Sequence, residues 1–154
     1  MKIGVYPGSF DPFTNGHLHV LKEASRLFDL IYVEIAVNEN KKRKTDKNSM
    51  KEAVEKVLIR ENIQNVKVEI YEGLTMNFAR EKKAEFIIRG LRNGTDYAYE
   101  ESLAIVNNKI AGIETIYFRA GKTAHISSST AMELYNYGED ISKLVPQEII
   151  EILR

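Results

Sequence analysis

The chain has 154 residues, of which 44% are hydrophobic and 29% are charged, a balance typical of a folded globular protein. Its 22 basic and 22 acidic residues give a formal net charge of +0, so no overall field attracts nucleic acid or an anionic membrane. The absence of cysteine excludes disulfides, thiolate catalysis and cysteine-bound metal.

The first residues lead directly into an apolar run, without a basic segment before it or a long apolar segment after it. We therefore expect no signal peptide. No apolar stretch approaches the roughly 18 residues of a membrane span. These features predict a cytoplasmic protein that binds neither nucleic acid nor membrane.

Short β-rich runs alternate with helical patterns along the whole sequence. In chain order we predict a strand at 3–6, a helix at 15–28, a strand at 30–37, a helix at 46–61, a strand at 66–71, a helix at 75–82, a strand at 86–88, a helix at 96–110, a strand at 115–118, a helix from about 128 and a short last helix near 146.

This alternation predicts a parallel sheet with helices on both faces. The run at 30–37 is apolar except for Glu34, as expected of a buried parallel strand. We predict one doubly wound, Rossmann-like α/β domain over 1–154, with a five-stranded parallel sheet. Because ligands of such sheets bind beyond the carboxyl ends of the strands, the loops after the strands are the candidate sites.

The loop after the first strand is rich in residues that suit an anion site. Gly8 lets a ligand approach the backbone, and Ser9 offers a hydroxyl and an amide. His17 falls in the first turn of a helix, where free amides favour a phosphoryl group. A metal pair with His19 is disfavoured, because residues two apart point to different faces of a helix.

Two arginines follow the fourth predicted strand. Arg89 and Arg92 carry guanidinium groups that bind phosphate bidentately, although arginines in a loop are also commonly just solvated. We expect both to lie just past the strand, with Gly90 between them allowing a tight backbone turn.

Two further loops have a structural and a functional interpretation. The serines at 127–129 precede a helix, where they either cap free amides or cradle a phosphate. The basic run at 41–44 is either a solvated loop or the source of a substrate-binding lysine.

The segment at 7–17 (PGSFDPFTNGH) resembles the signature of nucleotidyltransferases with a (His/Thr)-x-Gly-His motif, here TNGH at 14–17. IRGLR at 88–92, DYAYE at 96–100 and ISSS at 126–129 resemble the phosphopantetheine adenylyltransferase family, in its order and spacing. The resemblance extends over essentially the whole chain. It implies transfer of the adenylyl group of ATP to 4′-phosphopantetheine, with release of pyrophosphate and formation of dephospho-coenzyme A.

The resemblance also implies two groups of binding residues. The ATP site would comprise Ser9, Phe10, His17, Gly90, Leu91, Arg92, Glu100, Thr123, Ala124, His125, Ile126, Ser127, Ser128 and Ser129. The phosphopantetheine site would comprise Ser9, Lys41, Thr75 and Arg89, with Lys42 as an alternative to Lys41. Thr75 stands where the family often has an apolar residue, and Thr-Ala-His at 123–125 replaces a bulkier sequence of some relatives.

The implied mechanism is direct in-line displacement, since the attacking phosphate is already an anion and needs no strong base. His17 is the candidate catalytic donor. The resemblance further implies Mg²⁺ held mainly by phosphates and water, a homohexamer, and feedback binding of coenzyme A. The alternatives are another small-molecule adenylyl- or cytidylyltransferase of the same fold and a non-catalytic nucleotide-binding regulator.

Overall fold

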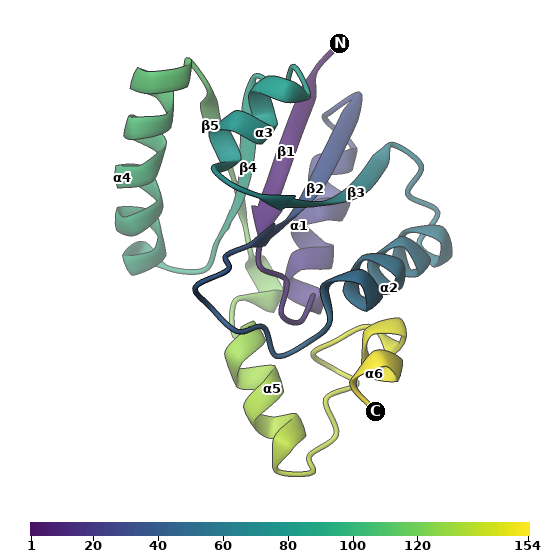
Figure 1. Ribbon diagram of the computed structural model, residues 1–154. Coiled ribbons are helices and arrows are strands. Elements are labelled where there is room, and N and C mark those ends of the chain that lie inside the picture. The colour runs from purple at the N-terminus through teal and green to yellow at the C-terminus, as the bar shows by residue number, and fades with distance from the viewer.

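The computed structural model describes all residues, 1–154 (Figure 1). Its strands are β1 (Ile3–Gly8), β2 (Leu30–Val37), β3 (Val66–Glu72), β4 (Phe86–Leu91) and β5 (Glu114–Arg119). Its α-helices are α1 (Asn15–Ser25), α2 (Lys47–Arg60), α3 (Thr75–Glu81), α4 (Gly94–Ala111), α5 (Ser128–Asn136) and α6 (Gln147–Leu153), with a 3-10 turn at Gly121–Thr123. None of the helices is both long and apolar enough to cross a membrane.

The five strands form one sheet in the order β3-β2-β1-β4-β5, and every neighbouring pair is parallel. This confirms the predicted doubly wound, Rossmann-like α/β fold. The chain moves outward from β1 to β3 and then returns to place β4 on the other side of β1. The direction of winding therefore changes between β1 and β4, which is where such folds bind their ligands.

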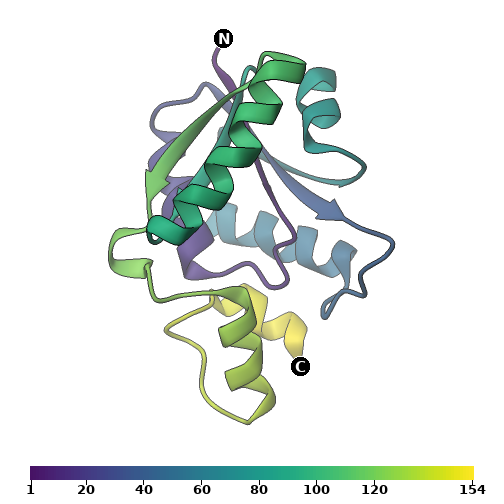
Figure 2. The ribbon, with the colours of Figure 1, turned by 90° about the vertical axis from the view of Figure 1, so that its left-hand side faces the viewer.

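The helices cover the two faces of the sheet unequally. The larger apolar core lies between the sheet and α1 and α2, where Val33 and Ile35 of β2 are fully buried. A smaller core lies under α3, around Val5, Phe78 and Ile87. Figure 2 shows α4 crossing in front of the sheet on this second face. None of the 18 residues of α4 is buried, so this helix contributes little to the core.

The last part of the chain lies beyond the carboxyl edge of the sheet, where α5 and α6 are drawn below the strands in Figure 1. Ile149 of α6 is fully buried in the larger core. The backbone N–H of Asn15 donates to the carbonyl of Leu144 at 2.8 Å. The C-terminal segment thus fixes the start of α1, next to the candidate active site.

Two boundaries differ from the prediction in a way that affects the site. β4 continues to Leu91, because Arg89 and Gly90 pair with Tyr117 and Phe118 of β5. The prediction that Arg89 lies past the strand was therefore wrong. The helix predicted from 96 begins at Gly94, because the side chain of Asn93 caps it.

Candidate active site

Two adjoining cavities open at the carboxyl edge of the sheet, close to the change in winding between β1 and β4. The first has a volume of about 300 Å³ and the second about 330 Å³. They share Pro7, Gly8, Ser9, Arg89 and Glu100. A ligand in one cavity can therefore meet a ligand in the other across these shared residues.

Most of the residues predicted for ATP line the first cavity. These are Ser9, Phe10, His17, Gly90, Arg92, Glu100, Thr123, Ile126, Ser127 and Ser128. Four others line neither of the two cavities, namely Leu91, Ala124, His125 and Ser129. Leu91 is the last residue of β4, Ala124 and His125 lie between the 3-10 turn and α5, and Ser129 is the second residue of α5.

All of the residues predicted for phosphopantetheine line the second cavity, namely Ser9, Lys41, Thr75 and Arg89. Lys42, the alternative to Lys41, is not among its lining residues. The opposite wall comes from α4 through Leu103, Ala104 and Asn107, which sequence reasoning had not assigned to any site.

His17 is held in a single orientation by a capping box at the start of α1. The backbone N–H of Thr14 donates to Nδ1 of His17 at 2.9 Å, and the N–H of His17 donates to Oγ1 of Thr14 at 3.4 Å. Because Nδ1 accepts a hydrogen bond, the neutral ring carries its proton on Nε2. His17 therefore presents an N–H donor from Nε2.

The surroundings of His17 keep its ring neutral. Its centroid lies 4.8 Å from that of Phe10 and 5.5 Å from that of Phe13. Burial, followed by the charges of Arg89 and Arg92, lowers the pKa of His17 from 6.5 to about 3. The imidazole is consequently an uncharged hydrogen-bond donor at neutral pH, in contrast to a cationic histidine.

Two helix N-termini converge on the first cavity. Thr14 and Ser127 cap α1 and α5 respectively, and both line the cavity. The hydroxyl of Ser128 donates to the carbonyl of Pro12 at 2.7 Å, which joins the serine loop to the loop after β1. Free amides and the positive ends of both helix dipoles thus favour an anion here.

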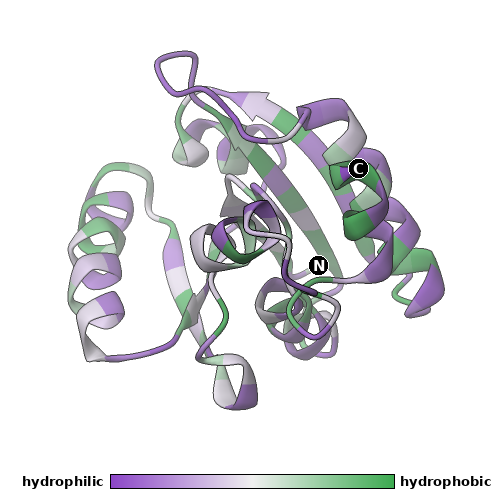
Figure 3. Ribbon diagram, turned by 90° about the horizontal axis from the view of Figure 1, so that it is seen from below, coloured by the Kyte–Doolittle hydropathy of each residue, from purple (hydrophilic) through white to green (hydrophobic).

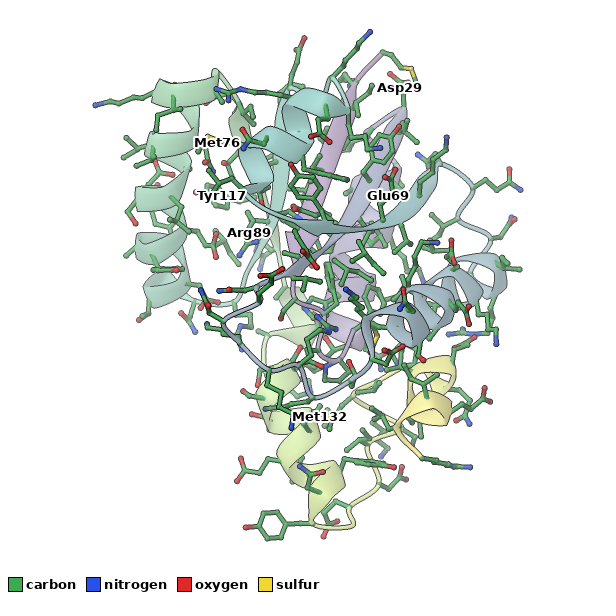
Figure 4. All side chains as sticks on the ribbon, viewed as in Figure 1. Asp29, Glu69, Met76, Arg89, Tyr117 and Met132 are labelled. Carbon is green, nitrogen blue, oxygen red and sulfur yellow. The ribbon has the colours of Figure 1, made fainter.

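Arg89 and Arg92 are each paired with a carboxylate of α4. Arg89 donates to both oxygens of Glu100 at 2.8 and 2.6 Å, and to the carbonyl of Pro7 at 3.0 Å. Arg92 donates from Nε to Asp96 at 3.1 Å. Figure 4 shows Arg89 on the side of the sheet that faces α4. These pairs orient the guanidinium of Arg89 at the junction of the two cavities and that of Arg92 in the first cavity.

The predicted tight turn at Gly90 is wrong, since Gly90 lies within β4 in extended pairing with β5. Its role is close packing: a Cβ atom built on Gly90 would lie 2.8 Å from Cγ2 of Val20 in α1. The absence of a side chain therefore lets α1 approach the strand that carries Arg89.

Arg43 is a structural residue of the site that the sequence did not reveal. Its guanidinium donates to the carbonyls of Ser9 and Phe10 at 2.6 and 3.3 Å. Asp11 in turn accepts from the backbone N–H of Thr45 at 2.8 Å. The basic loop is thereby fastened to the loop after β1, although the four-residue charge run alone could not show which member would fold back.

Residues 5–133 match the cytidylyltransferase-like family model. The fold and the paired cavities are accordingly those of a nucleotidyltransferase. The phosphopantetheine adenylyltransferase of Clostridium beijerinckii is 40% identical over 97% of this chain and 94% of its own length. That of Phocaeicola vulgatus is 41% identical over 96% of this chain and 97% of its own length. The chain belongs to the phosphopantetheine adenylyltransferase family.

Solved structures of more distant sequence share the fold. The Plasmodium falciparum nicotinic acid mononucleotide adenylyltransferase, complexed with NaAD, matches with a TM-score of 0.72 and 18% identity over 99% of this chain and 94% of that chain. A Vibrio parahaemolyticus protein provisionally named nicotinate-nucleotide adenylyltransferase matches with a TM-score of 0.76 and 19% identity over 99% of this chain and 92% of that chain. At these identities the likeness concerns the fold alone.

Proposed function

We propose that this chain transfers the adenylyl group of ATP to 4′-phosphopantetheine by direct in-line displacement, releasing pyrophosphate and dephospho-coenzyme A. The observation that carries the proposal is the pair of adjoining cavities. One holds most of the residues expected to bind ATP, the other holds all those expected to bind the acceptor, and Ser9 and Arg89 lie in both. Reactants placed in these cavities meet without an enzyme-bound intermediate.

The positions of the charged residues indicate where the phosphates of each substrate would bind. Lys41 and Arg89 would orient the phosphate of the acceptor and offset its repulsion from ATP. Arg92 and the serine loop at 127–129 would hold the β- and γ-phosphates, supported by the N-terminus of α5. Glu100 would turn the guanidinium of Arg89 toward the junction of the two cavities.

His17 would act as the donor to the α-phosphoryl group. Its Nε2–H remains available because Thr14 occupies Nδ1, and the ring needs no change of protonation during the reaction. A fixed neutral donor stabilises charge that develops on the phosphoryl oxygens without having to reorganise. The anionic acceptor phosphate supplies the nucleophile itself.

The proposal includes Mg²⁺ bound with ATP, which neutralises charge on the triphosphate. No group of three or more His, Asp or Glu side chains in the chain is placed to hold a metal ion. The carboxylates that line the first cavity, Asp96 and Glu100, are engaged by Arg92 and Arg89. We therefore assign the ion mainly to phosphate oxygens and water.

The proposal extends to a cytoplasmic homohexamer whose protomer is a single domain spanning 1–154. Its support is the exposed apolar surface of α4, where Tyr99, Leu103, Val106 and Ile110 recur at helical spacing on one side of the helix. Figure 3 shows this helix at the edge of the molecule, with apolar residues along it. Such a face is typical of a surface that another copy covers. Feedback binding of coenzyme A would use the second cavity, because coenzyme A contains the phosphopantetheine group.

The test is a product assay with ATP, Mg²⁺ and 4′-phosphopantetheine, following pyrophosphate and dephospho-coenzyme A together. We expect equal amounts of both products, and none when nicotinamide mononucleotide replaces the acceptor. Transfer to nicotinamide mononucleotide would instead favour another adenylyltransferase of this fold. ATP binding without any product from a panel of acceptors would favour a non-catalytic regulator.

A further inference from the structure

Glu34 is a buried carboxylate whose hydrogen bonding is incomplete. It lies in the middle of β2 with none of its surface exposed, and it is the sole buried charged side chain of the chain. Its Oε1 accepts a hydrogen bond from the hydroxyl of Thr75 at 2.9 Å. Its Oε2 is the only buried side-chain nitrogen or oxygen atom without a partner.

The carboxyl of Glu34 lies directly behind the wall of the second cavity. Its partner Thr75, its neighbour across the sheet Pro7, and Ala36 two residues along the same strand all line that cavity. Pro7 also accepts a hydrogen bond from Arg89, at the junction of the two cavities. Glu34 thus touches the acceptor side of the site without belonging to its surface.

The hydrogen bond to Glu34 determines what Thr75 can offer to a ligand. A hydroxyl has one proton to donate and two lone pairs to accept with. Since the proton of Thr75 points to Glu34, its oxygen can only accept from a group in the cavity. Leaving a buried oxygen such as Oε2 without a partner is costly, and an arrangement of this kind is retained most readily where it serves a site.

We propose that Glu34 and Thr75 act as a unit that recognises an amide N–H on the arm of the acceptor. Thr75 accepts the hydrogen bond from the amide, and Glu34 is a positioning residue that fixes the direction of the Thr75 hydroxyl. The inference rests on the proposed function, because phosphopantetheine supplies the amides. It gives Glu34, the one charged residue of an otherwise apolar strand, a role in acceptor specificity.

The test compares steady-state kinetics for 4′-phosphopantetheine and for two analogues in which one or the other amide is replaced by an ester. An ester keeps the shape of the arm but removes the N–H donor. For the wild type, we expect the KM of one analogue to be higher by about tenfold, the loss expected for a single such hydrogen bond. The other analogue should behave like the natural acceptor.

Variants then locate the recognition in the proposed pair. Thr75→Val and Glu34→Leu should each raise the KM for 4′-phosphopantetheine by about tenfold and abolish discrimination against the ester, while the KM for ATP stays within about twofold. Thr75→Ser and Glu34→Gln keep the required groups and should retain discrimination. The double variant should lose no more than either single variant, since the two side chains act as one unit.

Glu69→Gln provides a matched control, because Glu69 is the register partner of Glu34 on β3 and pairs with Lys82 outside both cavities. Figure 4 shows its position on β3, away from Arg89. This variant should match the wild type with all three acceptors. Thermal melting of every variant separates a folding defect from a change in KM.

Several results would overturn the inference. Equal KM values of the wild type for both esters and the natural acceptor would do so even if the apolar variants failed to fold. Undiminished discrimination by Glu34→Leu would reduce Glu34 to a structural role. If the wild type forms product but the Thr75→Val and Glu34→Leu variants have the KM values of the wild type, this inference alone is wrong. If the wild type forms no product, the proposed function is wrong and this inference fails with it.

Discussion

The two cavities share an edge of the sheet but differ in how firmly the fold supports them. The first lies against α1, whose residues Leu18, Val20, Leu21 and Ala24 are buried, and His17 is fixed there by its own capping box. The second has α4 as a wall, and that helix has no buried residue. Behind its wall lies the carboxyl of Glu34, which has one oxygen without a hydrogen-bond partner. In the proposed reaction, the catalytic donor would therefore lie on the rigid side of the site, and the acceptor would be recognised on the less covered side.

Replacing His17 with alanine tests the rigid side and should have the largest effect. We expect turnover to fall by ~10²–10³, as when a donor to a developing anion is removed, while calorimetric affinity for ATP changes little. His19→Ala is the matched control, since His19 is in the same helix but lines neither cavity. Unchanged turnover in a folded His17→Ala protein would exclude the ring from the mechanism.

Glu34→Gln tests whether the buried charge behind the wall of the second cavity lowers the stability of the fold. Burial raises the pKa of Glu34 from 4.5 to about 7, opposed by the Thr75 hydrogen bond and the charge of Arg89. Because the folded state then binds this proton more tightly than the unfolded state, wild-type stability should fall as pH rises from about 4.5 to 7.

The variant should escape this loss and become more stable than the wild type by up to about 3 kcal/mol above pH 7, with no advantage near pH 4.5. Urea unfolding at several pH values measures the difference. Tyr71 and Arg89, which interact with this carboxyl through charge, are unchanged in this comparison. A constant difference at all pH values would mean that Glu34 does not titrate in this window.

Gly90→Ala tests the close contact between α1 and β4 beneath the first cavity. The added methyl group would lie 2.8 Å from Cγ2 of Val20, so we expect a loss of about 1–3 kcal/mol in the free energy of unfolding. Gly94→Ala is the control, because its added methyl group would meet nothing within 4 Å. Equal melting temperatures of the two variants would contradict the packing account.

Arg89→Ala and Arg92→Ala together test whether the cavities divide the substrates. Arg89 lines both cavities and Arg92 lines only the first. We expect Arg89→Ala to raise the KM for phosphopantetheine by about tenfold and to raise the KM for ATP by less. Arg92→Ala should raise mainly the KM for ATP. The reverse pattern in steady-state kinetics would mean that the two sites are exchanged.

The order of elements could be predicted because each one buries its own apolar residues. The strand at Leu30–Val37 has the bounds that its apolar run indicates. The end of β4 could not be predicted, since Arg89 and Gly90 have no strand pattern and are ordered only by pairing with β5. Local sequence does not contain that pairing.

The site shows the same division between local and long-range information. His17 could be placed at the start of a helix from its neighbours, but its proton position depends on a backbone hydrogen bond from Thr14. Glu34 stood out as the one acidic residue of an apolar strand. That Thr75, 41 positions later, would donate to it follows only from the packing of α3 against the sheet.

The central claim is direct transfer between two adjoining cavities, and stereochemistry at the α-phosphorus tests it most directly. The reaction would be run with a single diastereomer of ATP in which sulfur replaces one non-bridging oxygen of the α-phosphorus. The configuration of the thio-substituted product would be determined by ³¹P NMR. One in-line displacement predicts inversion of configuration. Retention would require two displacements through an enzyme-bound adenylate, and it would contradict the account.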